Sequence, residues 1–504
     1  MTYTFDDYHE HMAKITDIGK AMRLQRWDKN TYMPHEGTHP RARQIATLAG
    51  LSQTLFTADW VGDMLQQLIT DDTLSDRQKR NVQQSLVDYN YAKAMPAEWT
   101  EKLVRVVSQA HTAWVDAKKG DDYSLFLTSF KQIVEMKREE SELRGYENHP
   151  YDVHIDKYEP GATVEKIDAV FVELKKSLLP LLQKINQAEQ PRTDFLFRYF
   201  PVDKQRELSN KIMPIIGLTS DKSRLDTSAH PFSTRMAPSD VRITTRFSAN
   251  NLMESLYSTI HECGHGMHSI GLNYDDYGLP SGEYERPDGV STQMALAESQ
   301  ARLWENNLGR SKAFMDLLYP MVKDTFPEQM EDVSQEEFWK GVNSLQKGFI
   351  RTDADELTYH FHIMIRYEIE RDLIAGAIEV EDVPNIWNTK YKEYLNIEPK
   401  NNTEGCLQDV HWSQGSIGYF PSYSLGSFYA AQYEAALRKN VQDCDPKLAL
   451  GETKEIIAWL KENIHQHGRL YSSEDLCERV TGEALNIQHF IDYATAKYAE
   501  IYSF

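Results

Sequence analysis

The 504-residue sequence contains few cysteines and no long hydrophobic run. Its four cysteines form no Cys-x-x-Cys pair and are too few to cross-link a chain of this length, which argues against a disulfide framework. No run of about 18 consecutive apolar residues occurs, so the sequence predicts no membrane span. The first seven residues carry neither a basic segment nor an apolar segment of the kind that directs secretion. We therefore expect a protein of the reducing cytoplasm.

Positive charge is also scarce. The sequence has 55 Lys and Arg residues against 76 Asp and Glu residues, a formal net charge of −21. A nucleic-acid-binding protein would carry a basic face or stripe, so this balance argues against a nucleic-acid partner. The 41% apolar and 26% charged residues are typical of a globular protein with a well-filled core and a solvated acidic surface.

Most of the sequence carries apolar residues at helical spacing. They recur in steps of three and four between Phe5 and Met22, and helical spacing returns between Ile456 and Ile464. One segment differs, because apolar and polar residues alternate from 241 to 247, the pattern of a half-buried strand. We predict a mainly α protein with a small β-sheet beside its active site.

The segment His261-Glu262-Cys263-Gly264-His265 indicates metal chemistry. It lies in a stretch with helical spacing, where positions i and i+4 share a face, so His261 and His265 can direct ring nitrogens at one ion. Glu262 projects about 100° around the helix from His261, beside the ion, where it can move a proton between water and a leaving amine. Cys263 projects at about 200° and is expected to pack in the protein. The segment predicts a zinc-dependent peptidase.

A catalytic zinc ion needs a third protein ligand and one open position. Glu298 lies in a second helical segment that is apolar on one side, and a carboxylate from a facing helix would complete a rigid His-His-Glu set. Pattern alone leaves other candidates open: His268, Asp275, Asp276, Glu283 and Glu285. We expect His268 at a solvated helix edge, whereas the other four lie in a loop rich in Gly and Pro.

Several separated motifs resemble those of the carboxypeptidase Taq family of metallocarboxypeptidases. They are His230-Pro231-Phe232, Asp240-Val241-Arg242-Ile243-Thr244, the segment 261–265, Glu298-Ser299-Gln300, Ile350-Arg351-Thr352-Asp353-Ala354-Asp355 and Gly405-Cys406-Leu407-Gln408-Asp409-Val410-His411-Trp412. The motifs keep the family's order and span most of the chain. One position departs, since Ala297 stands where the family usually has a His before its third metal ligand, which bears on rate or metal preference.

The resemblance implies a large helical peptidase fold. It implies one domain over residues 1–504, in which two helical lobes flank a deep active-site cleft, and a homodimer as the assembly. The implied reaction is zinc-dependent hydrolysis of the last peptide bond of peptides with a free C-terminal carboxylate, which releases single amino acids. Co²⁺ or Mn²⁺ could replace Zn²⁺ in such a site. No membrane or nucleic-acid partner is expected.

The resemblance also implies roles around the metal. Glu298 carries the third ligand, and Glu262 acts as general base and then as proton donor. Tyr423 and His411 are candidates for stabilising the oxyanion of the tetrahedral intermediate, with a core tyrosine as the alternative for Tyr423. Metal-bound histidines usually donate their second N–H to a carboxylate or carbonyl. The candidate acceptors are Asp240, Asp355 and Asp409.

Arg351 is the residue that the resemblance implies for reading the substrate's carboxylate. Its planar guanidinium can pair with both carboxylate oxygens. The alternative is a structural ion pair with Asp353 or Asp355 in the same helix. His230 and Arg242 are further predicted substrate-binding residues.

Arg242 has other possible partners. It could instead pair with Asp240 or Glu298, and we expect structural pairing to be its main task. Two rival functions also remain. One is a helical metallo-oligoendopeptidase with the same zinc chemistry, and the other is a non-catalytic peptide-binding scaffold that kept its metal. Glu262 argues against the scaffold, because a structural metal site gains nothing from a carboxylate beside the ligands.

Overall fold

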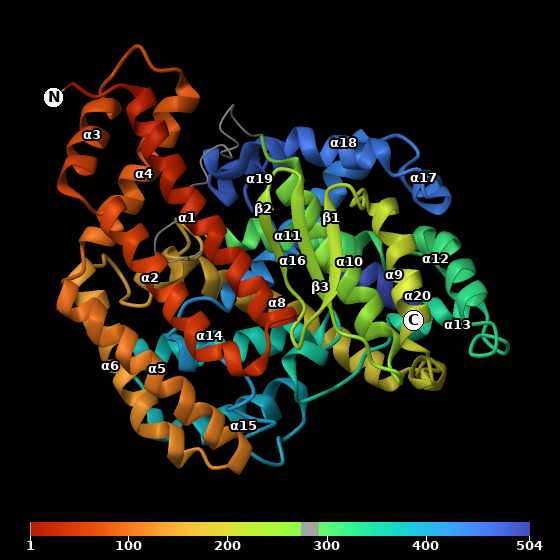
Figure 1. Ribbon diagram of the computed structural model, residues 1–504. Helices are drawn as coiled ribbons and strands as arrows, with labels where there is room; N and C mark the ends of the chain where they lie inside the picture. The colour runs from red at the N-terminus through yellow and green to blue at the C-terminus, as the bar shows by residue number, and fades with distance from the viewer. Residues whose placement is uncertain (1, 274–291) are drawn as a thin grey trace.

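The computed structural model describes residues 2–273 and 292–504, and these residues are predominantly helical (Figure 1). The first helices are α1 (Phe5–Thr31), α2 (Thr38–Phe56), α3 (Asp59–Ile69), α4 (Asp76–Lys93), α5 (Ala97–Gly120), α6 (Ser124–Arg144), α7 (Asp152–Asp156), α8 (Val164–Gln187) and α9 (Val202–Ile216). The later helices are α10 (Leu252–Gly271), α11 (Met294–Arg302), α12 (Lys312–Thr325), α13 (Gln335–Val342), α14 (Thr358–Ala375), α15 (Val383–Leu395), α16 (Pro421–Asn440), α17 (Cys444–Leu450), α18 (Lys454–Asn463), α19 (Ser473–Thr481) and α20 (Gln488–Tyr502). The prediction of a mainly α fold is confirmed.

A single small sheet is present in the described residues. Its strands are β1 (Ser223–Thr227), β2 (Ser233–Ala237) and β3 (Asp240–Thr245), in the order β1-β3-β2. The central strand β3 pairs in parallel with β1 and antiparallel with β2, and Ile243 is opposite Leu225 and Ser233. Val241 and Ile243 are fully buried, and β3 packs against α10. The predicted strand is therefore confirmed, although it ends at Thr245, and the sheet lies beside the motif helix.

The described residues form two hydrophobic cores. The smaller core belongs to the first four helices, which lie at one side of the molecule (Figure 1). Its buried members include Tyr8, Met12, Phe56 and Leu65. The larger core joins the helices from α5 onward with β3. Helix α1 also packs along β2 and so connects the first helices to the sheet.

The described residues also bear on two expected absences. All four cysteines are buried and unpaired, so the prediction of no disulfide framework is confirmed. Among the described helices, none combines the length and the apolar character needed to cross a membrane.

Candidate metal centre and substrate-binding cluster

Helix α10 positions the two histidines of the motif. The side chain of Asn251 caps the helix by accepting a hydrogen bond from the Met253 N–H at 3.1 Å. Its apolar face is buried in the larger core, while His261 and His265 lie half-buried one turn apart. Their ring centroids are 4.9 Å apart. The helix thus presents two imidazole rings on one side, as the i and i+4 spacing predicts.

Helix α11 brings Glu298 to these rings. Glu298 Oε2 lies 3.9 Å from His261 Nε2 and 3.6 Å from His265 Nε2. One ligand atom from each residue lies within 4.8 Å of the others, and no other such trio occurs among the described residues. Two imidazole nitrogens and one carboxylate are the donor set of a catalytic zinc site that keeps a position open. The residues present therefore fit a divalent metal.

The other candidate third ligands do not join this group. His268 is buried beside His465, with ring centroids 5.4 Å apart, so the expectation that it lies at a solvated edge is wrong. Its ring packs against His465, and it is not among the residues whose ligand atoms converge. The remaining candidates lie outside the described residues: Asp275, Asp276, Glu283 and Glu285.

Two glycines allow the three helices around Glu298 to approach closely. A Cβ atom at Gly264 would lie 2.5 Å from the carbonyl oxygen of Gln300 on α11. A Cβ atom at Gly426 on α16 would lie 2.6 Å from Cβ of Glu298. Any larger residue at either position would push α11 away from its neighbours. The glycine inside the motif therefore sets the distance between the histidines and Glu298.

Glu262 lies beside the metal trio, and one of its carboxylate oxygens accepts no hydrogen bond from the described residues. The side chain is 5% exposed, and its Oε2 atom has no hydrogen-bond partner among the described residues. Burial raises the pKa of Glu262 to about 7, and the nearby His265 opposes this rise. A carboxyl group with a pKa near neutrality can both accept and return a proton. Cys263 is buried in the core, as predicted, and burial raises the pKa of its thiol.

A π-helical segment after α11, Leu303–Leu308, supplies a residue that our sequence analysis missed. Glu305 Oε2 lies 2.8 Å from His261 Nδ1, the ring nitrogen that faces away from the trio. Arg302 donates to Glu298 Oε1 at 2.8 Å and to Glu305 Oε2 at 3.2 Å, which links both carboxylates. The carboxylate that accepts the second N–H of His261 thus belongs to Glu305. The expectation that an aspartate accepts it is wrong for His261. The three aspartates form other bonds: Asp240, Asp355 and Asp409.

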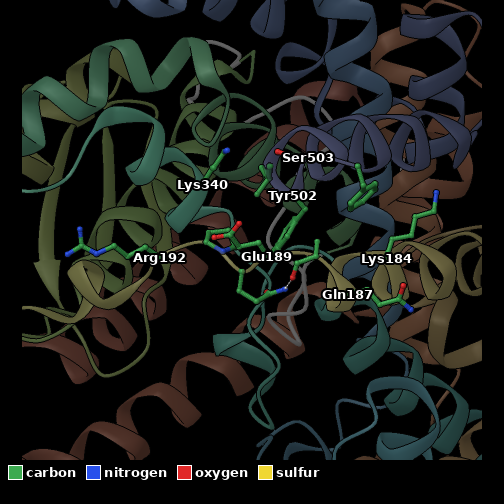
Figure 2. Close-up of a pocket in the computed structure, with 12 residues that line it drawn as sticks. Lys184, Gln187, Glu189, Arg192, Lys340, Tyr502 and Ser503 are labelled. Atoms are coloured by element: carbon green, nitrogen blue, oxygen red, sulfur yellow. Dashed lines mark hydrogen bonds between the residues drawn. The ribbon is translucent and has the colours of Figure 1, made fainter.

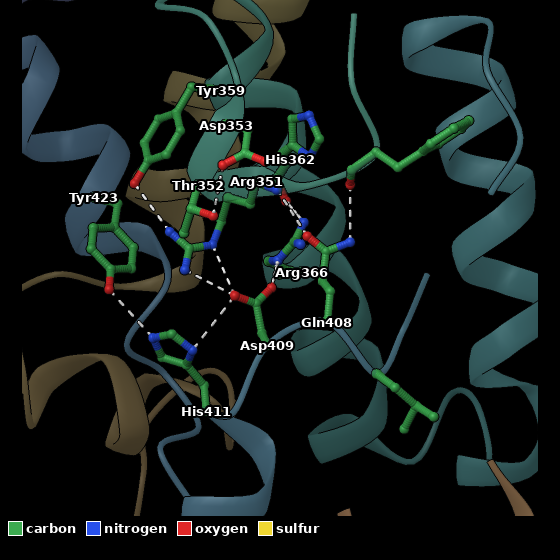
Figure 3. Close-up of polar contacts among 12 residues, drawn as sticks. Arg351, Thr352, Asp353, Tyr359, His362, Arg366, Gln408, Asp409, His411 and Tyr423 are labelled. Atoms are coloured by element: carbon green, nitrogen blue, oxygen red, sulfur yellow. Dashed lines mark hydrogen bonds and ion pairs between the residues drawn. The ribbon is translucent and has the colours of Figure 1, made fainter. Parts of the chain in front are cut away.

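Arg351 lies at the start of a short 3₁₀ helix, Arg351–Asp353, in a separate polar cluster (Figure 3). It donates to Asp409 Oδ1 through Nε at 3.0 Å and through Nη2 at 2.8 Å. The alternative considered for Arg351, an ion pair with an aspartate of its own motif, is not formed. Asp353 is exposed, and Asp355 accepts the backbone N–H groups that begin α14. The motif forms no long helix, so its charges do not meet at i+4 spacing.

His411 and Tyr423 join the same cluster (Figure 3). His411 Nε2 lies 3.3 Å from the Tyr423 hydroxyl, and the Arg351 guanidinium lies 4.9 Å from the Tyr423 ring. Burial lowers the pKa of His411 to about 3, although Asp409 opposes this shift, so the imidazole is neutral at physiological pH. Burial is also the main cause that raises the pKa of Tyr423. Both side chains are therefore neutral hydrogen-bonding groups.

The last two predicted residues lie on the side of the sheet. The residue as a whole is exposed at His230, but its imidazole is partly shielded from water, and this shielding together with the charges of Arg246 and Arg351 lowers its pKa. Arg242 donates to both oxygens of Asp240, at 3.0 and 2.9 Å, and its guanidinium lies 4.4 Å from the Trp27 ring. Of the partners considered for Arg242, the structure shows Asp240.

A surface pocket near the C-terminus is separate from these groups (Figure 2). It lies between the end of α8 and the end of α20, and its lining includes Lys184, Lys340 and Tyr502. None of the predicted site residues lines it.

A helical fold that gathers two histidines and a glutamate beside a buried second glutamate defines a metal-dependent peptidase. Residues 7–498 match the model of the carboxypeptidase Taq (M32) metallopeptidase family. The chain is 37% identical to carboxypeptidase 1 of Bacillus subtilis over 498 residues, which cover 98% of both chains. It is 35% identical to thermostable carboxypeptidase 1 of Thermus thermophilus over 510 residues, again 98% of both chains.

Solved structures agree. The M32 carboxypeptidase of Deinococcus radiodurans superposes with a TM-score of 0.94 at 35% identity, covering 98% of each chain. The Pyrococcus furiosus carboxypeptidase gives a TM-score of 0.94 at 33% identity and 99% coverage of each chain. The chain belongs to the carboxypeptidase Taq (M32) metallopeptidase family and is a metallocarboxypeptidase, a peptide hydrolase. The resemblance that the motifs carry is thereby confirmed, and the rival functions are not supported.

Proposed function

We propose that this metallocarboxypeptidase uses one Zn²⁺ ion, held by His261, His265 and Glu298, to release single amino acids from peptides with a free C-terminal carboxylate. The observation that carries the proposal is the convergence of these three side chains beside the buried Glu262. Bound zinc supplies a Lewis acid that activates water and polarises the scissile carbonyl. Co²⁺ or Mn²⁺ could substitute in this donor set.

Glu262 moves the proton in the proposed reaction. Its carboxylate takes a proton from the attacking water and later gives it to the departing amine. A pKa of about 7, raised by burial, suits both steps at neutral pH. Glu262→Gln should therefore abolish hydrolysis while metal still binds, because the amide keeps the shape of the side chain but cannot carry the proton.

Tyr423 and His411 are proposed to stabilise the oxyanion that forms at the scissile carbonyl. Each can donate a hydrogen bond without carrying a charge, and their mutual contact at 3.3 Å holds them together. His411 acts here as a neutral donor, because its pKa is lowered to about 3. Its Nδ1 atom lies 3.8 Å from Asp409 Oδ1 and has no hydrogen-bond partner among the described residues.

Arg351 is proposed to bind the terminal carboxylate, and His230 and Arg242 to contribute to the substrate-binding surface. Asp409 occupies Nε and Nη2 of Arg351, which leaves Nη1 with only a long contact of 3.4 Å to Tyr359. A charged donor of this kind can pair with a carboxylate. Arg242 contributes through its ion pair with Asp240 and its contact with Trp27, which shape the surface beside the sheet.

Mass spectrometry of a short peptide mixture tests the proposal. The expected result is stepwise loss of single C-terminal residues that a chelator abolishes and added Zn²⁺ restores. Amidated peptides should be poor substrates, and Arg351→Ala should cripple cleavage of free-carboxylate peptides while barely changing cleavage of amidated ones. Equal cleavage of both peptide types by the unmodified protein would contradict the proposal and favour an oligoendopeptidase.

We also propose a cytoplasmic homodimer whose protomer is one domain with two helical lobes around the active site. The four buried, unpaired cysteines suit a reducing compartment. The separate core of the first four helices supports a division into lobes. Light scattering tests the assembly, since the mass expected for a dimer is twice 58.3 kDa.

A further inference from the structure

The polar cluster around Asp409 contains a second arginine that no motif predicted. Arg366 on α14 is completely buried and donates from Nε to Asp409 Oδ2 at 2.6 Å. Arg351 occupies the other oxygen of the same carboxylate (Figure 3). Arg351 is 7% exposed, and the Asp409 side chain is 11% exposed. Two guanidinium groups therefore share one carboxylate in a site with little access to water.

The charges of this cluster do not cancel. Within the part of the chain that the structure describes, Asp409 is the one carboxylate within 4.0 Å of either guanidinium. The other contacts of Arg366 are with neutral groups: the backbone oxygen of His362 at 2.6 Å, the Tyr391 hydroxyl at 3.4 Å and the Trp387 ring at 4.4 Å. Its Nη2 atom has no hydrogen-bond partner among the described residues. Two cations and one anion leave a net charge of +1, and an uncompensated buried charge is costly.

The neighbouring titratable groups do not remove this charge. His411 and His362 are neutral at physiological pH, since burial lowers the pKa of both. Lys118 donates to the Gln408 carbonyl oxygen at 2.9 Å and is half-exposed, so water screens its charge. Lys118 is itself a cation and cannot supply the missing negative charge. The group that can is an anion that enters from outside the protein.

We propose that Arg366 is a specificity-determining positioning residue that acts through charge. By pairing with one oxygen of Asp409, Arg366 neutralises the negative charge of that carboxylate. The positive charge of Arg351 is then left for the substrate's terminal carboxylate to neutralise. Without Arg366, the pair of Arg351 and Asp409 would be neutral and would attract a free carboxylate no more than an amide. This inference rests on the proposed carboxylate-binding role of Arg351.

The test is a charge series measured on one peptide with a free C-terminus. Arg366→Met removes the extra cation, so KM should rise on the order of tenfold, the effect of one nearby charge in a partly screened site, while kcat changes little. Asp409→Asn combined with Arg366→Met restores the net charge to +1 and should bring KM back toward the wild-type value. The matched control is Arg371→Met on the same helix, whose guanidinium pairs with Asp168 and Asp372 and should leave KM unchanged.

The outcomes separate this inference from the function on which it rests. If the wild type cuts free and amidated peptides equally well, the proposed function fails. If the wild type prefers free carboxylates but folded Arg366→Met keeps its KM, the inference alone is overturned. It is also overturned if the double variant binds no better than Arg366→Met, because the loss is then geometric. Thermal unfolding checks folding, and Arg366→Gln replaces Arg366→Met if the latter does not fold.

Discussion

At the scale of single residues, Glu305 illustrates how a side chain that touches no metal can control a metal site. It accepts the outward-facing N–H of His261 at 2.8 Å and is held by Arg302 at 3.2 Å. An acceptor in this place fixes the tautomer and raises the basicity of the ligand ring. Glu305→Gln should therefore weaken zinc binding by about 10- to 100-fold, as measured by competition with a chromophoric chelator.

The control for this substitution is Glu328→Gln, an exposed position whose change should leave zinc affinity unaltered. An unchanged zinc affinity in Glu305→Gln would show that Glu305 serves only the fold.

Glu159 carries a pH effect on stability. It is 4% exposed and accepts the Ala295 N–H at the start of α11 at 3.0 Å. Burial raises its pKa from 4.5 to about 7, and the hydrogen bond from the Ala295 N–H opposes the rise. Because the pKa in the folded state is raised, the contribution of Glu159 to stability is fully present below about pH 4.5 and is lost as the pH rises through about 7. The loss is of the order of 3 kcal/mol.

Glu159→Gln should remove this dependence, because the amide never ionises. The difference between the unfolding temperatures of the variant and the wild type should increase in favour of the variant by roughly a few degrees from pH 5 to pH 8. Glu165→Gln, at an exposed position of α8, should give no such gain. A constant difference between Glu159→Gln and the wild type across this pH range would exclude ionisation of Glu159 as the cause.

At the scale of elements, the close contact of α10 and α11 determines whether three ligands can meet. Gly264→Ala places a Cβ atom 2.5 Å from the Gln300 carbonyl oxygen and 2.6 Å from Cα of Ala301, so backbone must move. We expect lower thermal stability and at least tenfold weaker zinc binding, because Glu298 moves with α11. Calorimetry and chelator competition measure the two effects.

Gly266→Ala on the same helix is the matched control. There the nearest atoms are side-chain carbons of Leu218, at 3.1 and 3.2 Å, which can shift. The change should cost less stability than Gly264→Ala and leave zinc affinity near the wild-type value. If the two substitutions behave alike, the contact between α10 and α11 does not set the geometry of the ligands.

The elements also show what the sequence could and could not predict. The apolar residues between Phe5 and Met22 lie in α1, and the stretch with helical spacing around the motif is α10, because a long periodic stretch carries a strong helical signal. Strand β3 was found by its alternation. Strands β1 and β2 were missed, because five residues that are mostly half-buried or exposed show no clear alternation.

The site residues also fall into those that the sequence predicted and those that it did not. His261, His265 and Glu298 were predicted because helical spacing and the motifs constrain them. Glu305 follows Glu298 by seven residues, a helical spacing that could have indicated it as a neighbour on the same face. The pairing of Arg351 with Asp409 joins residues 58 positions apart, outside any regular helix. No periodic pattern reports such a contact, so only the fold reveals it.

At the scale of the whole molecule, the first four helices have their own core and are joined to the rest by several polar contacts. One of these contacts is the ion pair in which Arg469 donates to both oxygens of Asp88 on α4, at 2.8 and 3.2 Å. Arg469 is 7% exposed and Asp88 is 5% exposed. Removing one partner of a buried ion pair leaves the other charge in a poorly solvated place. This lowers the free energy of unfolding by about 3–5 kcal/mol.

Arg469→Met should therefore loosen the first four helices before it unfolds the larger core, since each set of helices keeps its own hydrophobic interior. Hydrogen exchange should rise across α1–α4 and stay low in α14 and α16. Lys79→Met on α4, the helix of Asp88, breaks only a surface pair with Asp72, whose side chain is fully exposed, and should change neither region. A uniform rise in exchange over both cores would mean that the molecule unfolds as one unit and that the ion pair joins no separable parts.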